Sequence, residues 1–547
     1  MTKLLIRLFA ASLVMLLVSV TCCTSAFAAN LFGKESVTEA YSAIFVSKQA
    51  PAMISILNPE RLQSLDKAEY SFLKADFFKN SGVDFRKDVQ PWLGDEVTLA
   101  VTSLDFDRDP DNGKLPGYLL AMATKSPEKS REFVQVFFSK RVLAGADLSV
   151  EEFAGIKIIS DTPNSKATLA GAVVGDKYVL FANDPKVLRE AINNAQAPDL
   201  SLTSLLRYQD VKEVSTKSFG AAFFNLPMVA EWLGLKLPIQ TFDEQSVTLA
   251  PVSKGLLVQT VALSTQEILA PLESLSKPVN ALKYIPANVG IAVGSKDLST
   301  LSDSNLALFW QQLRSALLPQ GGTNGGINLN ISDFVQQNAE DQKRSSIDLS
   351  KDIFNWVQGE YAVGLISSEQ SPNWVFVTEK VPSTQEGIAN LDSIAAKNGL
   401  SVTEFNLLDQ HIVAWTQLKA TDTNKSANKP SFSIEAKAYG VHTTLDNYEI
   451  FTSSLETMYE VLTIKDNTLL ENRNFKKSIA VLPESNAGYV YINWAASQGI
   501  LERQLPVLKL LKVLAKPFFN NLRSLTITNY GSDNSSLKGD VFFQLEE

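Results

Sequence analysis

The chain carries one charged, tryptophan-containing stretch twice, and this repeat restricts the possible folds more than any other feature of the sequence. The copies span residues 84–96 and 348–360 and keep five identities in one register. The identical positions are Asp84, Lys87, Asp88, Trp92 and Glu96 in the first copy and Asp348, Lys351, Asp352, Trp356 and Glu360 in the second. Each copy leads directly into an apolar segment with the period of a β-strand, which indicates that one local structure is built twice.

Matching segments follow each copy in the same order, so the repeat extends well beyond the charged stretch. The matched pairs are Leu148–Phe153 with Leu400–Phe405, the predicted hairpin Ala167–Ala182 with Tyr439–Thr452, and Gly220–Asn225 with Gly488–Asn493. A shared order of this length is typical of a tandem duplication. We therefore predict a signal peptide over 1–28, a first copy over 29–275 and a second copy over 276–547, with a polar insertion at 302–346.

The pattern within each copy predicts an α+β fold. Most predicted strands follow one another as hairpins, and helices are inserted between groups of strands, with helix starts at Pro127 and Pro382. This order favours antiparallel sheets over a doubly wound parallel sheet. We predict two tandem homologous copies, each a largely antiparallel sheet with packed helices.

The N-terminal residues have the pattern of an export signal. Basic residues precede the apolar run 8–20, and Ala26-Phe-Ala28 supplies the small residues of a cleavage site. The run is shorter than the roughly 20 apolar residues that a membrane-spanning helix needs, which favours cleavage after Ala28 over an uncleaved anchor. A lipoprotein acylated at Cys22 or Cys23 is a third, less favoured alternative.

Cysteine use and charge exclude several classes of function. Both cysteines lie inside the predicted signal, so the mature protein has no disulfide, no thiolate nucleophile and no cysteine-based metal site. The formal net charge of −9 argues against nucleic acid as a partner. No P-loop, GxGxxG, HExxH or GxSxG string is present, and no cofactor is predicted.

The first copy of the repeat has further residues that suggest a family. The string Asp-x-x-Lys-Asp-x-x-x-Trp-Leu-Gly-x-Glu before a strand, and a hairpin ending in Ala182-Asn-Asp-Pro185 before a helix, resemble an exported, mostly cyanobacterial family known only as a domain of unknown function. The resemblance covers nearly all of the mature chain. It implies an extracytoplasmic protein, in the periplasm or the thylakoid lumen, and contributes no activity or site residue. The second copy has Gln358 where the first has Gly94, which argues against a strict role for that glycine.

The repeated carboxylates allow two interpretations. Asp88 with Glu96 resembles the pair of carboxylates that hydrolyses glycosidic bonds, which would make the protein a hydrolase of envelope polymers. In the alternative, Asp84 and Asp88 cap a short helix and Trp92 seals the sheet edge. The sequence favours the structural interpretation, because a catalytic pair kept in both copies would require two active sites. The only histidines, His411 and His442, are expected to have structural or surface roles.

An acidic turn is a candidate calcium site. Asp105, Asp107, Asp109 and Asp111 place oxygen ligands at alternate positions, as calcium loops do. The turn lacks the glycine and the bidentate glutamate of such a loop, and Tyr118 stands where the glutamate would be. A solvated hairpin turn is the favoured interpretation.

A basic and apolar segment at 501–522 suggests a membrane contact. Its lysines and Arg503 alternate with leucines, as in a helix that lies on an anionic membrane surface. The alternative is a core helix whose lysines extend to solvent. The preferred expectation is a non-enzymatic binding or scaffold protein that presents a sheet face or an inter-copy groove to another protein or an apolar ligand. The hydrolase and the peripheral membrane protein remain alternatives.

Overall fold

A computed structural model describes the chain over residues 40–57, 59, 83–162, 168–205, 208, 218–232, 242–264, 274–303, 352–367, 373–422, 432–504, 512, 516–531 and 535–546. The predicted signal peptide and nearly all of the predicted insertion lie outside these residues, as do Asp348 and Lys351. Within the described part, no helix combines the length and the apolar character needed to cross a membrane.

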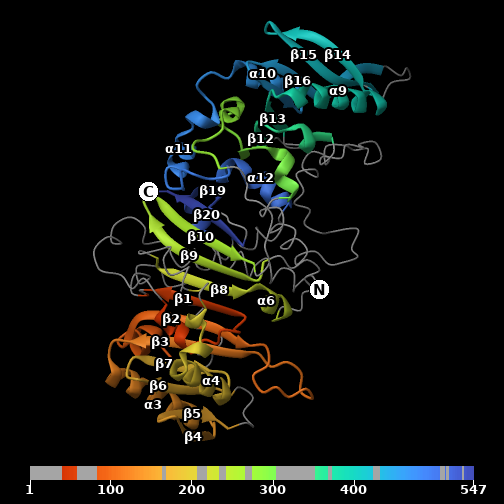
Figure 1. The fold of residues 1–547 in the computed structure, drawn as a ribbon. Helices are drawn as coiled ribbons and strands as arrows, with labels where there is room; N and C mark the ends of the chain where they lie inside the picture. Colours follow the sequence, from red (N-terminus) through yellow and green to blue (C-terminus); the bar gives the residue numbers. More distant parts are fainter. Residues whose placement is uncertain are drawn as a thin grey trace.

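The described strands form one continuous sheet of 20 strands, and each neighbouring pair is antiparallel (Figure 1). The N-terminal half of the sheet has the order β4 (Leu148–Phe153), β5 (Ile156–Asp161), β6 (Ala170–Val174), β7 (Tyr178–Ala182), β3 (Gly117–Thr124), β2 (Leu93–Ser103), β1 (Ala52–Leu57), β8 (Gly220–Asn225), β9 (Glu244–Val252) and β10 (Gly255–Leu263). The C-terminal half continues with β20 (Ser536–Leu545), β19 (Leu522–Tyr530), β18 (Tyr489–Asn493), β11 (Ile291–Lys296), β12 (Glu360–Ile366), β13 (Asn373–Glu379), β17 (Tyr448–Thr452), β16 (Phe432–Leu445), β15 (Gln410–Asp422) and β14 (Ser401–Leu407).

The two halves join at one pair of strands, β10 and β20, which we call the seam. Its register runs from Gly255 opposite Gln544 to Leu263 opposite Ser536, and its central pair is Gln259 opposite Asp540. Counted outward from the seam, the strands follow the order 10, 9, 8, 1, 2, 3, 7, 6, 5, 4 on one side. On the other side each number is larger by ten. The two halves therefore have the same order of neighbouring strands, and β4 and β14 form the two ends of the sheet.

The sequence predicted a separate sheet for each copy, and this part of the prediction is wrong, because the described strands make a single sheet. The α+β class and the antiparallel pairing are confirmed. The physical reason for the single sheet is that β10 and β20 each stand at the edge of their own half. An edge strand presents unpaired N–H and C=O groups, and the two edges satisfy each other at the seam.

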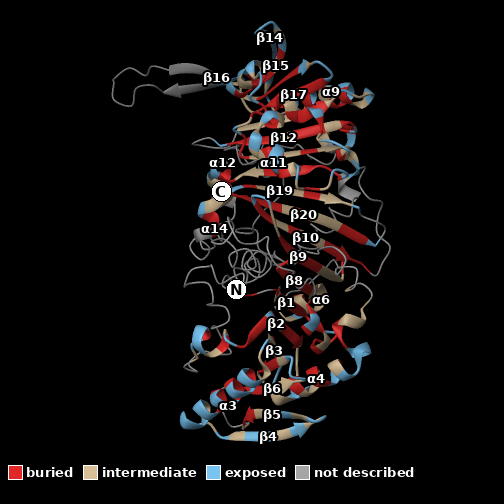
Figure 2. Ribbon diagram, turned by 90° about the vertical axis from the view of Figure 1, so that its left-hand side faces the viewer, coloured by how far each residue is buried: buried red, intermediate tan, exposed pale blue. Residues whose placement is uncertain are grey.

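Helices cover both faces of the sheet, which explains why many strands are apolar on both sides. In the N-terminal half, α3 (Pro127–Leu143) and α4 (Pro185–Gln196) lie on opposite sides of the strands (Figure 2). Both begin with the proline that the sequence indicated, and Asp184 Oδ1 caps α4 by accepting the Lys186 amide at 2.8 Å. Among the described residues, the remaining α-helices are α6 (Leu226–Trp232), α9 (Pro382–Lys397), α10 (Leu455–Thr463), α11 (Arg473–Ile479), α12 (Trp494–Gln504) and α14 (Lys516–Asn521).

Side chains from both halves share one core beneath the centre of the sheet. Val258 of β10 and Phe543 of β20 pack in one cluster with Trp494 of α12 and Phe518 of α14. Phe518 is fully buried, and the Trp494 and Phe519 rings stack with centroids 5.1 Å apart. The seam is therefore held by apolar packing as well as by backbone hydrogen bonds.

Candidate functional site

Glu96, the last residue of the first repeat copy, is a buried anchor for a short helix. It lies on β2 and is only 2% exposed. Its carboxylate accepts the Ser42 backbone amide at 3.1 Å, the Ser42 hydroxyl, and the Thr98 hydroxyl at 3.1 Å. Ser42 belongs to the 3-10 helix η1 (Tyr41–Phe45), so the glutamate holds this helix on the sheet. Burial raises the pKa of Glu96, and the hydrogen bonds from Ser42 and Thr98 offset part of that rise.

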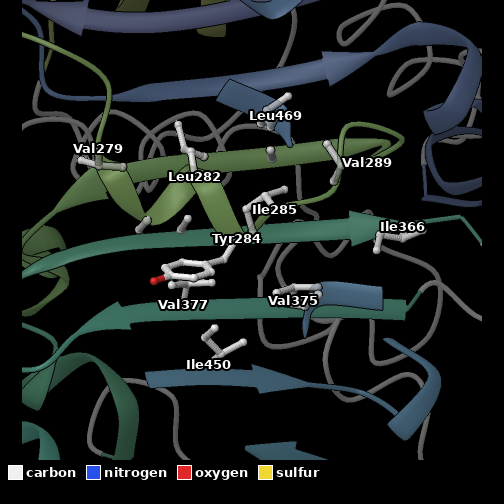
Figure 3. Close-up of a cluster of buried hydrophobic side chains, with 14 of the residues drawn as sticks. Val279, Leu282, Tyr284, Ile285, Val289, Ile366, Val375, Val377, Ile450 and Leu469 are labelled. Atoms are coloured by element: carbon white, nitrogen blue, oxygen red, sulfur yellow. The ribbon is translucent and has the colours of Figure 1, made fainter. Parts of the chain in front are cut away.

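Glu360 has the same role in the second copy. Its Oε2 accepts the Asn280 backbone amide at 2.7 Å and the Tyr448 hydroxyl at 2.9 Å. Asn280 is the first residue of the 3-10 helix η6 (Asn280–Tyr284), which precedes β11 as η1 precedes β1. Leu282 and Tyr284 of η6 pack into the core of the C-terminal half (Figure 3). Each repeat thus ends in a glutamate that ties a 3-10 helix to the sheet.

The earlier part of the repeat forms a capped turn beside a buried tryptophan. Asp84 Oδ1 accepts the Arg86 and Lys87 amides at 3.0 and 3.2 Å, and Asp88 Oδ2 accepts the Asp84 amide at 2.8 Å. The Trp92 indole donates to the Asp88 carbonyl oxygen at 2.8 Å. Likewise, the Trp356 indole donates to the Asp352 carbonyl oxygen at 2.7 Å. The indole hydrogen bond is the same in both copies.

The sequence interpretation placed Trp92 at a sheet edge, but the structure places it directly before β2, a strand that pairs on both sides. Its side chain is 1% exposed and packs against Phe133 of α3, with ring centroids 5.1 Å apart. The turn that precedes it, η3 (Phe85–Val89), is a single π-helical turn in which Lys87 is exposed. The tryptophan therefore connects this turn to the helix that covers β2.

The two candidate catalytic carboxylates do not converge. Successive residues of a strand point to opposite faces, and Val97, next to Glu96, packs with Trp92 in the core under α3. Asp88 Oδ2 lies 3.9 Å from Lys140 Nζ of α3, which places it on that same face. Glu96 points to the other face, toward η1. This arrangement offers no carboxylate pair flanking a substrate.

The acidic turn uses its carboxylates to hold its own backbone. Asp107 Oδ1 accepts the Asp109 amide at 3.3 Å, and Asp109 Oδ1 accepts the Asp111 amide at 3.0 Å. A hydrogen bond from the Asn112 amide holds the pKa of Asp107 below its ordinary value. In the described part of the chain, which includes Asp105, no three His, Cys, Asp or Glu side chains are grouped to bind a metal ion.

The calcium site therefore stays a hypothesis, and titration calorimetry of calcium into the mature chain would test it. If the loop binds calcium, an Asp107→Asn, Asp109→Asn variant should lose the heat of binding that the unchanged chain gives, because two of its charged oxygen ligands are gone. Equal heats from the two proteins would contradict the hypothesis.

The structure contains a second buried polar cluster, which the sequence analysis did not predict. His442 of β16 is 5% exposed and lies between two carboxylates. Its Nδ1 is 2.9 Å from Glu449 Oε1 on β17, and its Nε2 is 3.3 Å from Asp392 Oδ1 on α9. The Trp415 indole of β15 donates to the same Asp392 oxygen at 2.7 Å, and the Thr444 hydroxyl donates to Glu449 Oε2 at 2.7 Å. We call these residues the His442 cluster.

The cluster keeps its histidine charged at neutral pH. Burial alone would lower the pKa of His442, but hydrogen bonds to Asp392 and Glu449, and their negative charges, raise it to about 9. For Asp392, burial acts to raise the pKa, and the bonds from His442 and Trp415 outweigh it and lower the pKa. The cluster is a buried imidazolium between two carboxylates, with the ring stacked on Phe451 at 5.2 Å.

The equivalent place in the N-terminal half is apolar. Gly171 stands opposite Phe181 in the β6–β7 ladder, as His442 stands opposite Phe451 in the β16–β17 ladder. A Cβ on Gly171 would come within 2.7 Å of the Phe138 ring, so phenylalanine fills the space there. The charged cluster is thus a feature of the C-terminal half. Glu449 lies seven residues from His442 on the next strand, but Asp392 lies 50 residues away on a helix, so the three residues form no local motif.

The basic segment 501–522 is described only in parts. Residues 505–511 and 513–515 lie outside the described residues. Near its C-terminal end, Phe518 and Phe519 face the shared core, and Lys512 Nζ lies 3.3 Å from Gln498 Oε1 of α12. The membrane contact stays a prediction.

Comparisons with known proteins identify a family but no activity. A family model described as "Protein of unknown function (DUF3352)" matches residues 8–545. No curated protein matches the chain. Among solved structures, crystal form IV of TP0453 aligns with a TM-score of 0.25 and 9% identity, covering 40% of this chain and 79% of that one. Crystal form I of TP0453 aligns with a TM-score of 0.25 and 10% identity, covering 42% and 82%. At these scores the likeness carries no argument about this chain.

Proposed function

The chain belongs to the DUF3352 family, and on that premise we propose that it is an exported, non-enzymatic binding or scaffold protein of the cell envelope or thylakoid lumen. Its ligand is a protein or an apolar molecule. One observation carries the proposal. The most prominent carboxylates of the sequence, Glu96 and Glu360, each accept a backbone amide of a 3-10 helix, and so both serve the fold.

We further propose that the chain arose by tandem duplication of one α+β unit. The neighbour-by-neighbour order of strands β1–β10 and β11–β20 supports this proposal. The matched indole hydrogen bonds of Trp92 and Trp356 support it independently, because they are side-chain contacts that strand topology does not dictate. A binding surface on such a sheet would extend over both halves.

Substitution of the two glutamates separates the scaffold from the hydrolase alternative. In Glu96→Gln, the new amide group would face the Ser42 N–H donor, so we expect the free energy of unfolding to fall by about 1–3 kcal/mol. In Glu360→Gln, we expect about 1 kcal/mol or less, because the bond to the Asn280 amide is exposed. Urea denaturation measures both changes.

A hydrolase would respond to these substitutions differently. Loss of turnover on envelope polysaccharide in a Glu96→Gln protein of unchanged stability would contradict the proposal. The converse experiment uses the mature chain as bait in envelope and thylakoid fractions, with partners identified by mass spectrometry. The Glu96→Gln protein, used as a second bait below its melting temperature, is the matched control. We expect it to retain the same partner, because the residue is 2% exposed and lies beneath η1.

Export and membrane contact have their own tests. Mass spectrometry of the mature protein should find Ala29 as the first residue if the predicted signal is cleaved. If the segment 501–522 holds the protein on an anionic membrane surface, high salt should release it from washed membranes and low salt should not. Release without salt would contradict the peripheral membrane alternative.

A further inference from the structure

The centre of the seam is occupied by a buried carboxyl group. Asp540 of β20 is 1% exposed and stands directly opposite Gln259 of β10. Its Oδ1 accepts the Tyr530 hydroxyl of β19 at 2.9 Å, and the Gln259 side chain also hydrogen-bonds to it. Both partners are neutral. A charge at this position would therefore be buried between the two halves of the sheet without an opposite charge from these partners.

The strand register defines which other groups surround Asp540. Thr248 and Thr528 complete its cross-strand row, and the Thr528 hydroxyl donates to the Gly488 carbonyl oxygen at 2.6 Å. Within two residues of this row on β9, β10, β20, β19 and β18, the ionisable side chains on the same face are Lys538, Tyr530, Tyr489 and Tyr491. Helix α11 packs against this face through Ser478, which contacts Gln544, and its charged residues Arg473, Lys476 and Lys477 are exposed. Burial raises the pKa of Asp540 to about 6, and hydrogen bonds from Tyr530 and Gln259 offset only part of that rise.

We propose that Asp540 makes the seam sensitive to pH, with the neutral acid holding the two halves together and the carboxylate loosening them. The carboxylate takes up one proton from solvent to give the neutral acid, which has an O–H donor. The carboxylate has only acceptor oxygens, so its charge favours opening of β10 from β20, which exposes it to water.

The raised pKa of Asp540 determines how the stability of the seam changes with pH. Because the pKa of Asp540 in the closed seam, about 6, lies above the ordinary 3.8, the stabilisation is complete below about pH 3.8 and is lost as pH rises through 6. A shift of about two units corresponds to roughly a 100-fold change in the opening equilibrium over the whole window. Roughly tenfold of this falls between about pH 5 and pH 8.

Hydrogen exchange of the full chain tests the proposal. Exchange rates of peptides from β10 and β20, divided by the intrinsic rate at each pH, report opening of the seam. We expect opening to increase about tenfold from pH 5 to pH 8 in the unchanged chain. In Asp540→Asn it should stay constant, because asparagine cannot ionise. The matched control, Asp466→Asn, changes an exposed aspartate and should behave as the unchanged chain.

A second variant keeps the proposal testable if Asp540→Asn does not fold. Tyr530→Phe removes a donor that favours the carboxylate, so the midpoint of seam opening should move to higher pH. A midpoint that does not move, seam opening that is independent of pH in the unchanged chain, or an equal pH response in Asp540→Asn would each overturn the proposal.

Discussion

Replacement of His442 by alanine is expected to lower the free energy of unfolding by about 3–5 kcal/mol, because removal of one member of a buried ion pair leaves the others uncompensated. Glu449 is 2% exposed, and without the imidazole its Oε1 loses the described partner that it has in the fold, while Oε2 keeps the Thr444 hydroxyl. Asp392 also loses its charged partner. Urea denaturation followed by tryptophan fluorescence measures the loss, and Trp415 reports it locally through its bond to Asp392.

The same cluster predicts how stability depends on pH. The pKa of His442 in the fold is about 9, above its ordinary 6.5, so its contribution is complete below about pH 6.5 and is lost as pH rises through 9. The full contribution is about 3 kcal/mol. We expect His442→Ala to flatten this part of the profile and His411→Ala, at a 64% exposed side chain, to leave it unchanged. A profile that stays the same in His442→Ala would contradict the charged cluster.

Replacement of Trp92 by alanine is expected to cost about 3–5 kcal/mol, which is typical when a fully buried aromatic side chain leaves a cavity. The indole is enclosed by Phe133 and the η3 turn, and its N–H bond to Asp88 would also be lost. Thermal unfolding and urea denaturation both measure the change.

Trp356→Ala should give a loss of similar size, since its indole makes the same backbone bond. Because the two sites lie in different halves of the sheet, the double variant should be additive within about 0.5 kcal/mol. Leu143→Ala, at an 88% exposed side chain, is the control and should change stability by less than about 0.5 kcal/mol. A loss below about 1 kcal/mol in Trp92→Ala would contradict its role in connecting η3 to α3.

Local patterns predicted local structure well. The predicted hairpins correspond to β6–β7 and β16–β17, and Pro127 and Pro382 begin helices, because strand alternation and the restricted φ of proline act over a few residues. The role of Asp84 as a helix cap is of the same kind, since the Arg86 and Lys87 amides that donate to its side chain lie within three residues.

Long-range partners could not be predicted in the same way. The sequence marked Glu96 as important but not its partner Ser42, which lies 54 positions away. The His442 cluster joins residues of one helix and three strands, and only the folded sheet brings Asp392 within reach of the histidine. The single sheet was missed for a related reason. Alternation shows which face of a strand is buried, and it says nothing about which edge finds a partner.

The seam also sets an order of events in folding. Gln259 and Asp540 are neighbours in space, but the chain between them contains all of β11 to β19. During synthesis, the edge of β10 therefore stays open while the C-terminal half is still incomplete, and contacts of such long sequence separation form slowly. An open strand edge pairs readily with other chains. We therefore expect the chain to be most prone to aggregation in the period before β20 pairs with β10, and a variant in which this pairing is slower to aggregate more during folding.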